Sequence, residues 1–399
     1  MPQKLSETVR RHALFLVGAA VLCMSVGINM HAAMNVNFLK ELLSATSWQQ
    51  GYLESFRELG GLTPFFVLAL LAGRSEPRIA ALMLLIMGAG LSAYCRLHVV
   101  TQVMFVSLAW SVGFHTWAPL SSSLTLALSP RGHEGHTVGT IGRVGAAGTF
   151  LALGGVWLLR TRGGMGMREL FLIAGLVTAV GAVPLLFVPG IRVRSERVPL
   201  LRMFEPRFRL YLALEFADGM RKQIFILFAV LCLVQEHGIP VETIALLMLA
   251  NQGVNFILAP LAGRLVDRIG ERSALTAYFT GLIVVFLLYA LMTDVRALYV
   301  VYVLDNAMWQ LRIGVTTYAN RIAAGHERTR LLSMGITMNH IGSVSMPLIG
   351  GALYAALGYR FPFLGGAALA LFSIFLARRV PLRKPLAHPG LTAGPDRPL

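Results

Sequence analysis

The sequence predicts an all-α membrane protein of 12 transmembrane helices in two pseudo-symmetric six-helix bundles, with both termini cytoplasmic. The composition indicates a membrane protein: 56% of the 399 residues are hydrophobic, only 14% are charged, and the mean hydropathy is +0.66. Soluble domains are ~45–50% apolar and ~25% charged. At ~20 apolar residues per span, the chain accommodates about ten to thirteen helices and no separate soluble domain. The composition therefore excludes a soluble enzyme and a disordered chain.

Twelve apolar segments bounded by charges or turn residues carry the helix count. They lie at about 12–39, 48–72, 79–97, 99–128, 137–159, 169–189, 207–235, 241–262, 273–293, 296–322, 331–357 and 361–377. The first follows Arg10 and Arg11 as in a signal peptide, but it continues to Asn29 without a small-residue cleavage site, so we expect a membrane helix. The three cysteines have no CxxC spacing, which argues against a disulfide framework.

The distribution of basic residues predicts the orientation, because positively charged loops stay on the cytoplasmic side of a membrane. The two tails and the even-to-odd loops hold 23 Lys and Arg, and the opposite loops hold 7. Both termini are therefore expected in the cytoplasm, and the expected location is the cell (inner) membrane. The net charge of +16 is a topology signal, so we expect no nucleic acid partner.

The longest polar connection, 190–206, is expected to be a cytoplasmic linker between two halves. An N-terminal six-helix half is expected at 1–189, a C-terminal six-helix half at 207–380, and a short cytoplasmic tail at 381–399. The halves resemble each other: the second span ends LALLAGRSEPRI, and 190 residues later the eighth ends LAPLAGRLVDRI. Such a parallel duplication is typical of two-half transporters.

Polarity follows a period of three helices. The cores of spans three (79–95), six (170–188), nine (273–293) and twelve (361–377) contain no Asp, Glu, Lys, Arg, His, Asn or Gln, whereas the other eight spans each contain at least one. Polar groups inside a membrane must face protein or water. We therefore expect every third helix at the periphery and the other eight around a polar interior.

The connection between spans eight and nine reads GRLVDRIGER and resembles the loop signature G-x-L-x-D-R-x-G-[RKE]-[RK] of the major facilitator superfamily. The resemblance covers about residues 10–380 and implies that superfamily's fold, alternating access, and a cavity lined by spans one, four, seven and ten. It also implies a gating loop that latches the halves in the outward-facing state, made of Gly263, Asp267, Arg268, Gly270 and Arg272. Gly263 is expected to allow tight packing at the membrane edge, and Asp267 to cap the next helix or to pair with Arg268 or Arg272.

Two departures from family patterns bear on mechanism. The first-half copy of the loop, Gly73 to Arg78, lacks the Asp, and Glu76 is the candidate substitute. The glycine-rich fifth helix of drug/proton antiporters, which ends G-P-x-x-G-G, is partly present: the fifth span has the glycines without the proline, and the eleventh contains PLIGG. Close helix packing explains such glycines equally well. The pattern favours export slightly over uptake.

Ten charged side chains are expected to be buried inside the spans. Placing each charged side chain in a membrane costs a free energy of ~2.5–3.5 kcal/mol, so a set that had no role would be strongly unfavourable. At ~100° per residue, Glu215, Asp218 and Lys222 share one stripe of the seventh span. The alternative interpretation is that the charges only neutralise one another as interhelical pairs. The set consists of Arg57, Arg143, Arg221, Lys222, Arg312, Glu54, Glu58, Glu215, Asp218 and Asp305.

Carboxylates are the candidates for proton coupling: Glu54, Glu58, Glu215, Asp218 and Asp305. The candidates for substrate binding are Asn29, His31, His115, Lys222, Asn255, Trp309, Arg312 and His340. Each histidine is alternatively a hydrogen-bonded packing residue, or a proton carrier because its free pKa lies near neutrality. Although His31, His115 and His340 with Asp305 would offer metal ligands, no local spacing supports such a site, and no metal is expected.

The mixed-sign lining predicts a secondary active transporter of a small charged or zwitterionic organic solute, coupled to a proton or another ion. The motifs of nucleophilic hydrolysis, zinc proteases and ATP binding are absent from the sequence, so neither an enzyme nor a cofactor is expected. Proton-coupled uptake of a small organic anion is the alternative within transport, and a non-transporting sensor or scaffold is the alternative outside it. The expected partners are the solute, the coupling ion and the lipid bilayer. A monomer suffices because one chain carries both halves.

Overall fold

The computed structural model describes residues 6–71, 73–130, 132–190, 205–323 and 327–382. Within these residues the chain is helical and contains no strand. Eight helical segments are long and apolar enough to cross a membrane, as expected of a multi-pass protein. The expected linker and tail lie almost entirely outside the described residues.

The helices follow one another with short connections. They are α1 (Glu7–Asn37), α2 (Ser47–Glu58), α3 (Pro64–Leu70), α4 (Glu76–Ala93), α5 (Val100–Leu128), α6 (Glu134–Thr161), α7 (Met167–Val180), α8 (Ala182–Leu185), α9 (Arg209–Gln223), α10 (Val241–Leu291), α11 (Val295–Trp309), α12 (Ile313–Ile322), α13 (Arg328–Leu357) and α14 (Arg360–Arg378). Tighter 3₁₀ turns and wider π turns extend or join several of them, at η1 (Phe38–Leu42), η2 (Leu59–Leu62), η3 (Tyr94–Arg96), η5 (Pro206–Phe208), η6 (Ile224–Ala229), η7 (Cys232–Glu236) and η8 (Gln310–Arg312).

These turns account for the difference between eight long helices and the twelve expected segments. The expected segments 48–72, 207–235 and 296–322 are each interrupted, by η2, by η6 and η7, and by η8. The segments 241–262 and 273–293 both lie in the single element α10. Turns therefore divide three of the expected helices, and two other expected helices form the single element α10.

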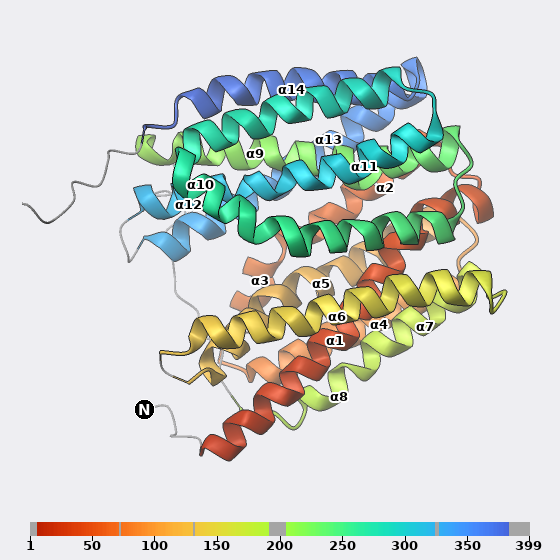
Figure 1. Ribbon diagram of the computed structural model, residues 1–399. Helices are drawn as coiled ribbons and strands as arrows, with labels where there is room; N and C mark the ends of the chain where they lie inside the picture. The colour runs from red at the N-terminus through yellow and green to blue at the C-terminus, as the bar shows by residue number, and fades with distance from the viewer. Residues whose placement is uncertain (1–5, 72, 131, 191–204, 324–326, 383–399) are drawn as a thin grey trace, which may run out of the picture.

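Gly270 breaks α10 into two arms. Its φ of 79° and ψ of 161° are non-helical and lie in a region that only glycine adopts at low cost. The chain reverses direction there, and the second arm returns beside α14 (Figure 1). Tyr289 of this arm stacks on Phe363 of α14, with ring centroids 4.7 Å apart. The glycine of the loop signature thus makes a tight reversal.

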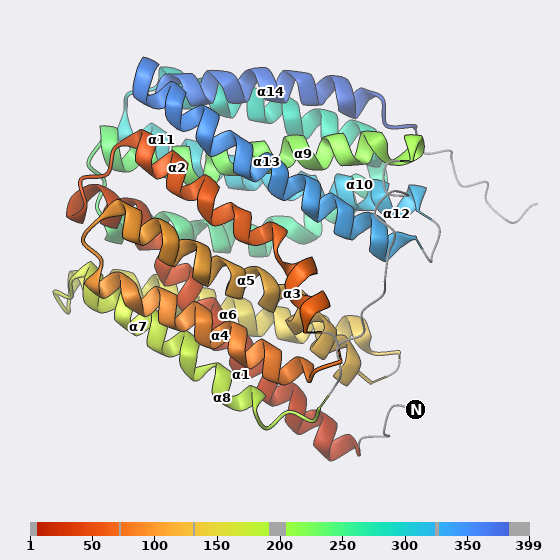
Figure 2. The same cartoon turned by 180° about the vertical axis from the view of Figure 1, so that it is seen from behind.

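The helices form two groups. Figure 1 shows α1 and α4–α8 together in the lower group and α9–α14 in the upper group. Figure 2 shows α2 crossing to lie beside α13. Small residues allow this approach: a Cβ on Gly51 of α2 would lie 2.4 Å from the Pro347 carbonyl oxygen and 3.0 Å from the Gly351 Cα. The α2–α13 contact therefore joins the two groups closely.

The outer helices α4, α7, α8 and α14, with the second arm of α10, correspond to the segments without strongly polar residues. Figure 1 places α7 and α8 along the lower edge and α14 with that arm along the upper edge. Their main contacts are with helices of their own group. The charged helices α2, α9, α11 and α13 lie between them.

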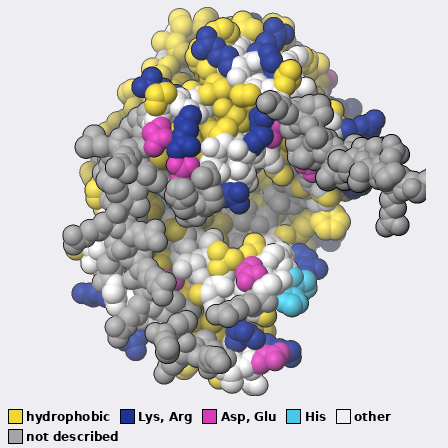
Figure 3. Space-filling view, turned by 90° about the vertical axis from the view of Figure 1, so that its left-hand side faces the viewer, with side chains coloured by type: hydrophobic (Ala, Val, Ile, Leu, Met, Phe, Trp, Pro, Cys, Tyr) yellow, Lys and Arg dark blue, Asp and Glu magenta, His cyan; other side chains and the backbone are white. Residues whose placement is uncertain are grey.

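The two groups meet on the side away from the termini. There the Lys40 ammonium donates to the Val234 and Gln235 carbonyl oxygens at 2.5 and 3.0 Å, and the Asn37 amide donates to the Ile239 carbonyl at 2.9 Å. On the opposite side, where α1 begins and α14 ends, Figure 3 shows the surface hollowed between the two groups. The assembly is therefore joined at one end and recessed at the other.

Candidate functional site

A compact ion cluster occupies the end of α2. Glu54, Arg57 and Glu58 follow the i, i+3, i+4 spacing that places side chains on one helix face. The Arg57 Nε donates to Glu54 Oε2 at 2.9 Å, and its Nη2 donates to Glu58 Oε1 at 2.6 Å. Both carboxylates are buried. One guanidinium thus serves two acids, as the spacing in the sequence predicts.

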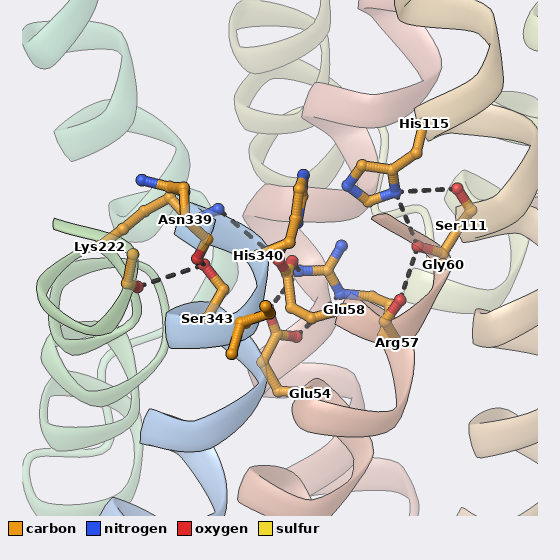
Figure 4. Close-up of polar contacts among 12 residues, drawn as sticks. Glu54, Arg57, Glu58, Gly60, Ser111, His115, Lys222, Asn339, His340 and Ser343 are labelled. Carbon is orange, nitrogen blue, oxygen red and sulfur yellow. Dashed lines mark hydrogen bonds and ion pairs between the residues drawn. The ribbon is translucent and has the colours of Figure 1, made fainter. Parts of the chain in front are cut away.

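Glu58 also joins the two groups of helices (Figure 4). Its Oε2 lies 3.6 Å from the Lys222 Nζ of α9 and 3.2 Å from the His340 Nδ1 of α13. The Glu58 side chain is only 4% exposed, whereas that of Lys222 is 19% exposed. A buried carboxylate of α2, the helix that crosses toward the upper group, is therefore held by cationic and imidazole groups of α9 and α13.

His115 of α5 completes this interface. Its Nδ1 lies 2.9 Å from the Ser111 carbonyl oxygen, and its ring meets that of His340 edge to face with centroids 4.7 Å apart. The Ser111 hydroxyl in turn donates to the Arg57 carbonyl oxygen at 2.7 Å. Figure 4 shows the two imidazoles on the same side of Glu58.

A second charged cluster lies inside the upper group. The Arg312 Nε donates to Asp218 Oδ2 at 2.5 Å, and its Nη2 donates to Glu215 Oε2 at 2.8 Å. The Asn339 amide and the Tyr278 hydroxyl donate to the two oxygens of Asp218 at 3.1 and 3.2 Å. The Arg312 side chain is 28% exposed, but that of Asp218 is 1% exposed. This cluster thus combines a buried acid with a reachable cation.

Asp305 and Arg221 form a separate and fully enclosed ion pair. Their side chains are 0% and 3% exposed. The rings of Phe225, Tyr278 and Trp309 lie 5.8–5.9 Å from the guanidinium carbon of Arg221. Each charge is stripped of water, so each depends on the other for compensation.

An amide network connects the first arm of α10 to α11 and η8. The Asn306 and Gln310 amides donate to the Asn255 side-chain oxygen at 2.7 and 2.6 Å, and Asn306 also reaches the Asn251 carbonyl oxygen at 3.3 Å. These side chains satisfy one another across the two helices. Asn255 is thereby placed next to the helix that carries Trp309 and Asp305.

Two predicted binding residues of α1 lie apart from these clusters. The Asn29 amide donates to the Ser25 carbonyl oxygen at 2.8 Å and to the Thr149 hydroxyl of α6 at 3.1 Å. His31 is buried and lies edge-on to Trp110, with centroids 4.6 Å apart, and to the rings of Tyr94 and Phe171. The structure thus separates His31 from the imidazole pair, and Asp305 from both.

Solved structures of transporters share this arrangement. A crystal structure of a mutant of the nucleoside transporter NupG aligns with a TM-score of 0.77 at 14% identity, over 92% of this chain and 98% of that one. A bacterial homologue of the human lysosomal transporter Spinster, inward-facing and unoccupied, aligns with a TM-score of 0.75 at 14% identity, over 94% of this chain and 97% of that one. At these identities the likeness concerns the fold.

The sequence supplies the deciding observation, because residues 211–398 match the family model described as Major Facilitator Superfamily. The C-terminal half of the chain belongs to the major facilitator superfamily. A curated relative, the probable vesicular acetylcholine transporter-A of Danio rerio, is 26% identical over 130 residues, which are 32% of this chain. The match spans only 25% of the length of that relative. The chain is therefore a multi-pass membrane protein of a transporter family.

The facilitator loop signature differs in one respect from the expectation. Gly263 lies within the first arm of α10, and a Cβ at this position would meet open space, so the expected tight packing at Gly263 is wrong. The signature glycine with a constrained backbone is Gly270, whose φ is 79°. A charge of the signature does reach another helix, because Glu271 pairs with Arg321 of α12 at 3.5 Å.

Packing accounts for only part of the glycines in α6. A Cβ on Gly148 would lie 2.8 Å from the Leu22 carbonyl oxygen of α1, whereas Gly139, Gly142, Gly154 and Gly155 face open space.

The side chain of Arg143, in the same helix, was expected to be buried. Arg143 is instead exposed and donates to the Thr140 hydroxyl at 3.2 Å, so the expected set of ten buried charges is wrong at this member.

Tyr278 and Asn339 belong to the site although neither is among the predicted site residues. Tyr278 lies in the ninth segment, which was expected to be entirely peripheral because it has no charged or amide residue. Its phenol is buried and reaches Asp218 from the second arm of α10. Buried tyrosines usually find a hydrogen-bond partner, so a tyrosine in an apolar span is a site candidate that the pattern of charged and amide residues does not identify.

Proposed function

We propose that this facilitator is a secondary active transporter that moves a small charged or zwitterionic organic solute by alternating access, coupled to protons. The observation that carries the proposal is the bridge from Glu58 to Lys222 and His340, which places titratable groups of both helix groups in contact. Alternating access requires the halves to move against each other around a central site. A charged contact between them is where solute or proton binding alters that movement.

We assign twelve spans by counting the two arms of α10 separately and by joining α2 with α3, α7 with α8, α9 with its π turns, and α11 with α12. The halves are then 1–189 and 207–380, joined by the cytoplasmic linker 190–206 and followed by the tail 381–399. With cytoplasmic termini, the hollow of Figure 3 opens to the cytoplasm. This assignment makes the structure inward-facing, the state named for the Spinster homologue.

Glu58 and Asp218 are the strongest candidates for proton coupling. Each is buried and paired with a cation that is partly exposed, Lys222 in one case and Arg312 in the other. A carboxylate in such a pair exchanges its cation for a proton, which frees the cation for an anionic group of the solute. Glu54 and Glu215 share these arginines and extend the two clusters. Asp305 has an enclosed partner, which favours a structural role for that pair.

Lys222 and Arg312 are the proposed contacts for an anionic group of the solute. His115, His340, Asn255 and Trp309 supply hydrogen-bonding and aromatic groups near the same helices. A zwitterion matches the mixed charge, because buried carboxylates lie beside both cations. Export remains the preferred direction, on the glycine pattern of the fifth and eleventh spans. Uptake of an organic anion requires only the two cations.

Proton flux in proteoliposomes tests this function. A pH-sensitive dye inside the vesicles reports proton movement when pools of amino acids, organic acids and cationic compounds are added in turn. We expect one pool to move protons with the wild type, and Asp218→Asn to abolish that signal. Glu7→Gln is the matched control, because Glu7 is an exposed acid paired only with Arg11 on its own helix. Silence with every pool in folded protein contradicts the proposal and favours a sensor or scaffold.

A further inference from the structure

Three metal-ligating side chains converge where the two groups of helices meet. Glu58 of α2, His115 of α5 and His340 of α13 each offer one ligand atom, and these atoms lie within 4.8 Å of one another. Figure 4 shows the two imidazoles and the carboxylate around a common space. Glu58 and His340 are buried, and His115 is partly buried. No short sequence motif links the three, because they come from three separate helices.

The hydrogen bonds of His115 fix its tautomer. A carbonyl oxygen only accepts, so the contact at 2.9 Å with the Ser111 carbonyl requires the proton on Nδ1. The Ser111 hydroxyl gives its own proton to the Arg57 carbonyl and is therefore an acceptor toward the same nitrogen. In the neutral ring, Nε2 then carries a free lone pair. Metal-binding histidines are commonly oriented in this way, by donating the other ring N–H to a carbonyl oxygen.

The carboxylate orients the second imidazole. The His340 Nδ1 lies 3.2 Å from Glu58 Oε2, which accepts its proton while Glu58 Oε1 accepts from Arg57. A metal ion between Glu58 and His340 takes the place of this proton, so the His340 ligand atom is Nδ1 and the proton of the neutral ring moves to Nε2. Its surroundings are tight, since a Cβ on Gly61 would lie 2.3 Å from His340 Nδ1. Two imidazole nitrogens and one carboxylate are thus held together by contacts of their own.

The ligand types indicate which ion this cluster suits. Two imidazoles with one carboxylate form a ligand set of zinc sites that keep a fourth position open. Bonds of about 2.1 Å in a tetrahedron place ligand atoms about 3.4 Å apart. Glu58 and His340 already approach this spacing at 3.2 Å, so the wider separations within the 4.8 Å cluster, which involve His115, must shorten. His340 belongs to the upper group and His115 to the lower one. Metal binding would therefore pull the groups toward each other.

Two cations oppose metal binding, and both face Glu58. Arg57 is shared with Glu54, so two carboxylates offset its charge. Lys222 faces Glu58 from α9 at 3.6 Å, and its partly exposed side chain has a flexible stem that lets the ammonium move away. Lys222 and a metal ion hence compete for the same carboxylate. Removal of the lysine charge should increase affinity for the metal.

We propose that Glu58, His115 and His340 form a binding site for a divalent transition metal ion of the zinc class, which links the two groups of helices. The site follows from the geometry of these side chains and does not depend on the transport function proposed above. It departs from the expectation of no metal, and it differs from the set considered in the sequence, because His31 and Asp305 lie in other clusters.

Direct metal titration tests the proposal on the purified full-length protein in detergent, with any affinity tag removed. Co²⁺ is the probe, since its visible absorption reports tetrahedral coordination, and Zn²⁺ is the competitor. We expect one Co²⁺ per chain, displaced by Zn²⁺. His115→Gln and His340→Gln should weaken binding by at least about tenfold, the lower limit for loss of a group that only supports a metal ligand. Lys222→Ala should tighten it.

His12→Gln is the matched control, because His12 is exposed near the start of α1. Its Co²⁺ affinity should equal that of the wild type. Thermal unfolding gives a second readout: Zn²⁺ should raise the midpoint of the wild type and of Lys222→Ala, but not that of His115→Gln. Absence of stoichiometric Co²⁺ binding by the wild type overturns the proposal, as does unchanged affinity in folded His115→Gln or His340→Gln. No solute is added, so failure here leaves the transport proposal intact.

Discussion

The enclosed pair of Arg221 and Asp305 allows the most quantitative prediction. Asp305→Asn removes the carboxylate charge and leaves the guanidinium with the backbone oxygen of the same residue, at 3.3 Å, and with three aromatic rings. Arg221→Met leaves the carboxylate alone instead. Removing one partner of a buried pair costs about 3–5 kcal/mol, because the remaining charge is uncompensated. Since both side chains are at most 3% exposed, water cannot compensate either charge, and we expect each single variant to reach that range.

The double variant Arg221→Met/Asp305→Asn distinguishes pairing from loss of packing. It leaves no buried charge, so its free energy of unfolding should recover most of the loss, giving a coupling energy of at least about 4 kcal/mol. Equilibrium unfolding in mixed micelles, followed by tryptophan fluorescence, measures all four proteins. Glu7→Gln in the exposed pair with Arg11 should cost less than about 1 kcal/mol. Single variants that cost less than about 1 kcal/mol, the limit expected for the exposed pair, would refute the reasoning. A double variant that costs the sum of the two single losses would refute it as well.

Three further predictions concern backbone and surface features. Gly270→Ala should cost about 1–3 kcal/mol in unfolding experiments because its φ of 79° strains any other residue, whereas Gly263→Ala, in open helical space, should be neutral or stabilising; equal losses contradict this. The N–H groups of Ala297 and Arg296 hold the pKa of the Asp294 carboxyl below its usual range. This capping contribution is therefore present at neutral pH and lost as the pH falls through the lowered pKa. The difference in thermal midpoint between wild type and Asp294→Ala should consequently shrink in acid. A difference that does not change with pH argues against this role of Asp294. Gly51→Leu should separate α2 from α13, and hydrogen exchange should rise in both helices but not in α4.

The local part of the site is predictable from sequence. The spacing of Glu54, Arg57 and Glu58 predicts one shared face, and the structure brings the three into one ion cluster. The loop signature likewise marks the reversal at Gly270. Both features depend on residues a few positions apart, so helix geometry alone determines them.

Partners that are distant along the chain could not be predicted in this way. Asp305 and Arg312 lie seven residues apart on one expected helix, yet Asp305 pairs with Arg221 and Arg312 with Asp218. The turn at η8, which ends at Arg312, tightens the helix after Asp305 and changes the direction of successive side chains. His340 meets Glu58 from 282 positions away. Such pairs depend on how helices pack, which the periodicity of one helix does not determine.

The central claim is that Glu58 and Asp218 couple solute movement to protons, and one comparison tests it most directly. Once a solute is identified, proteoliposomes measure both its pH-driven accumulation and its exchange at equal pH. Exchange needs the halves to move with solute bound but needs no net proton movement. The account predicts that Glu58→Gln and Asp218→Asn keep exchange and lose accumulation. Accumulation at the wild-type level in both variants would contradict it.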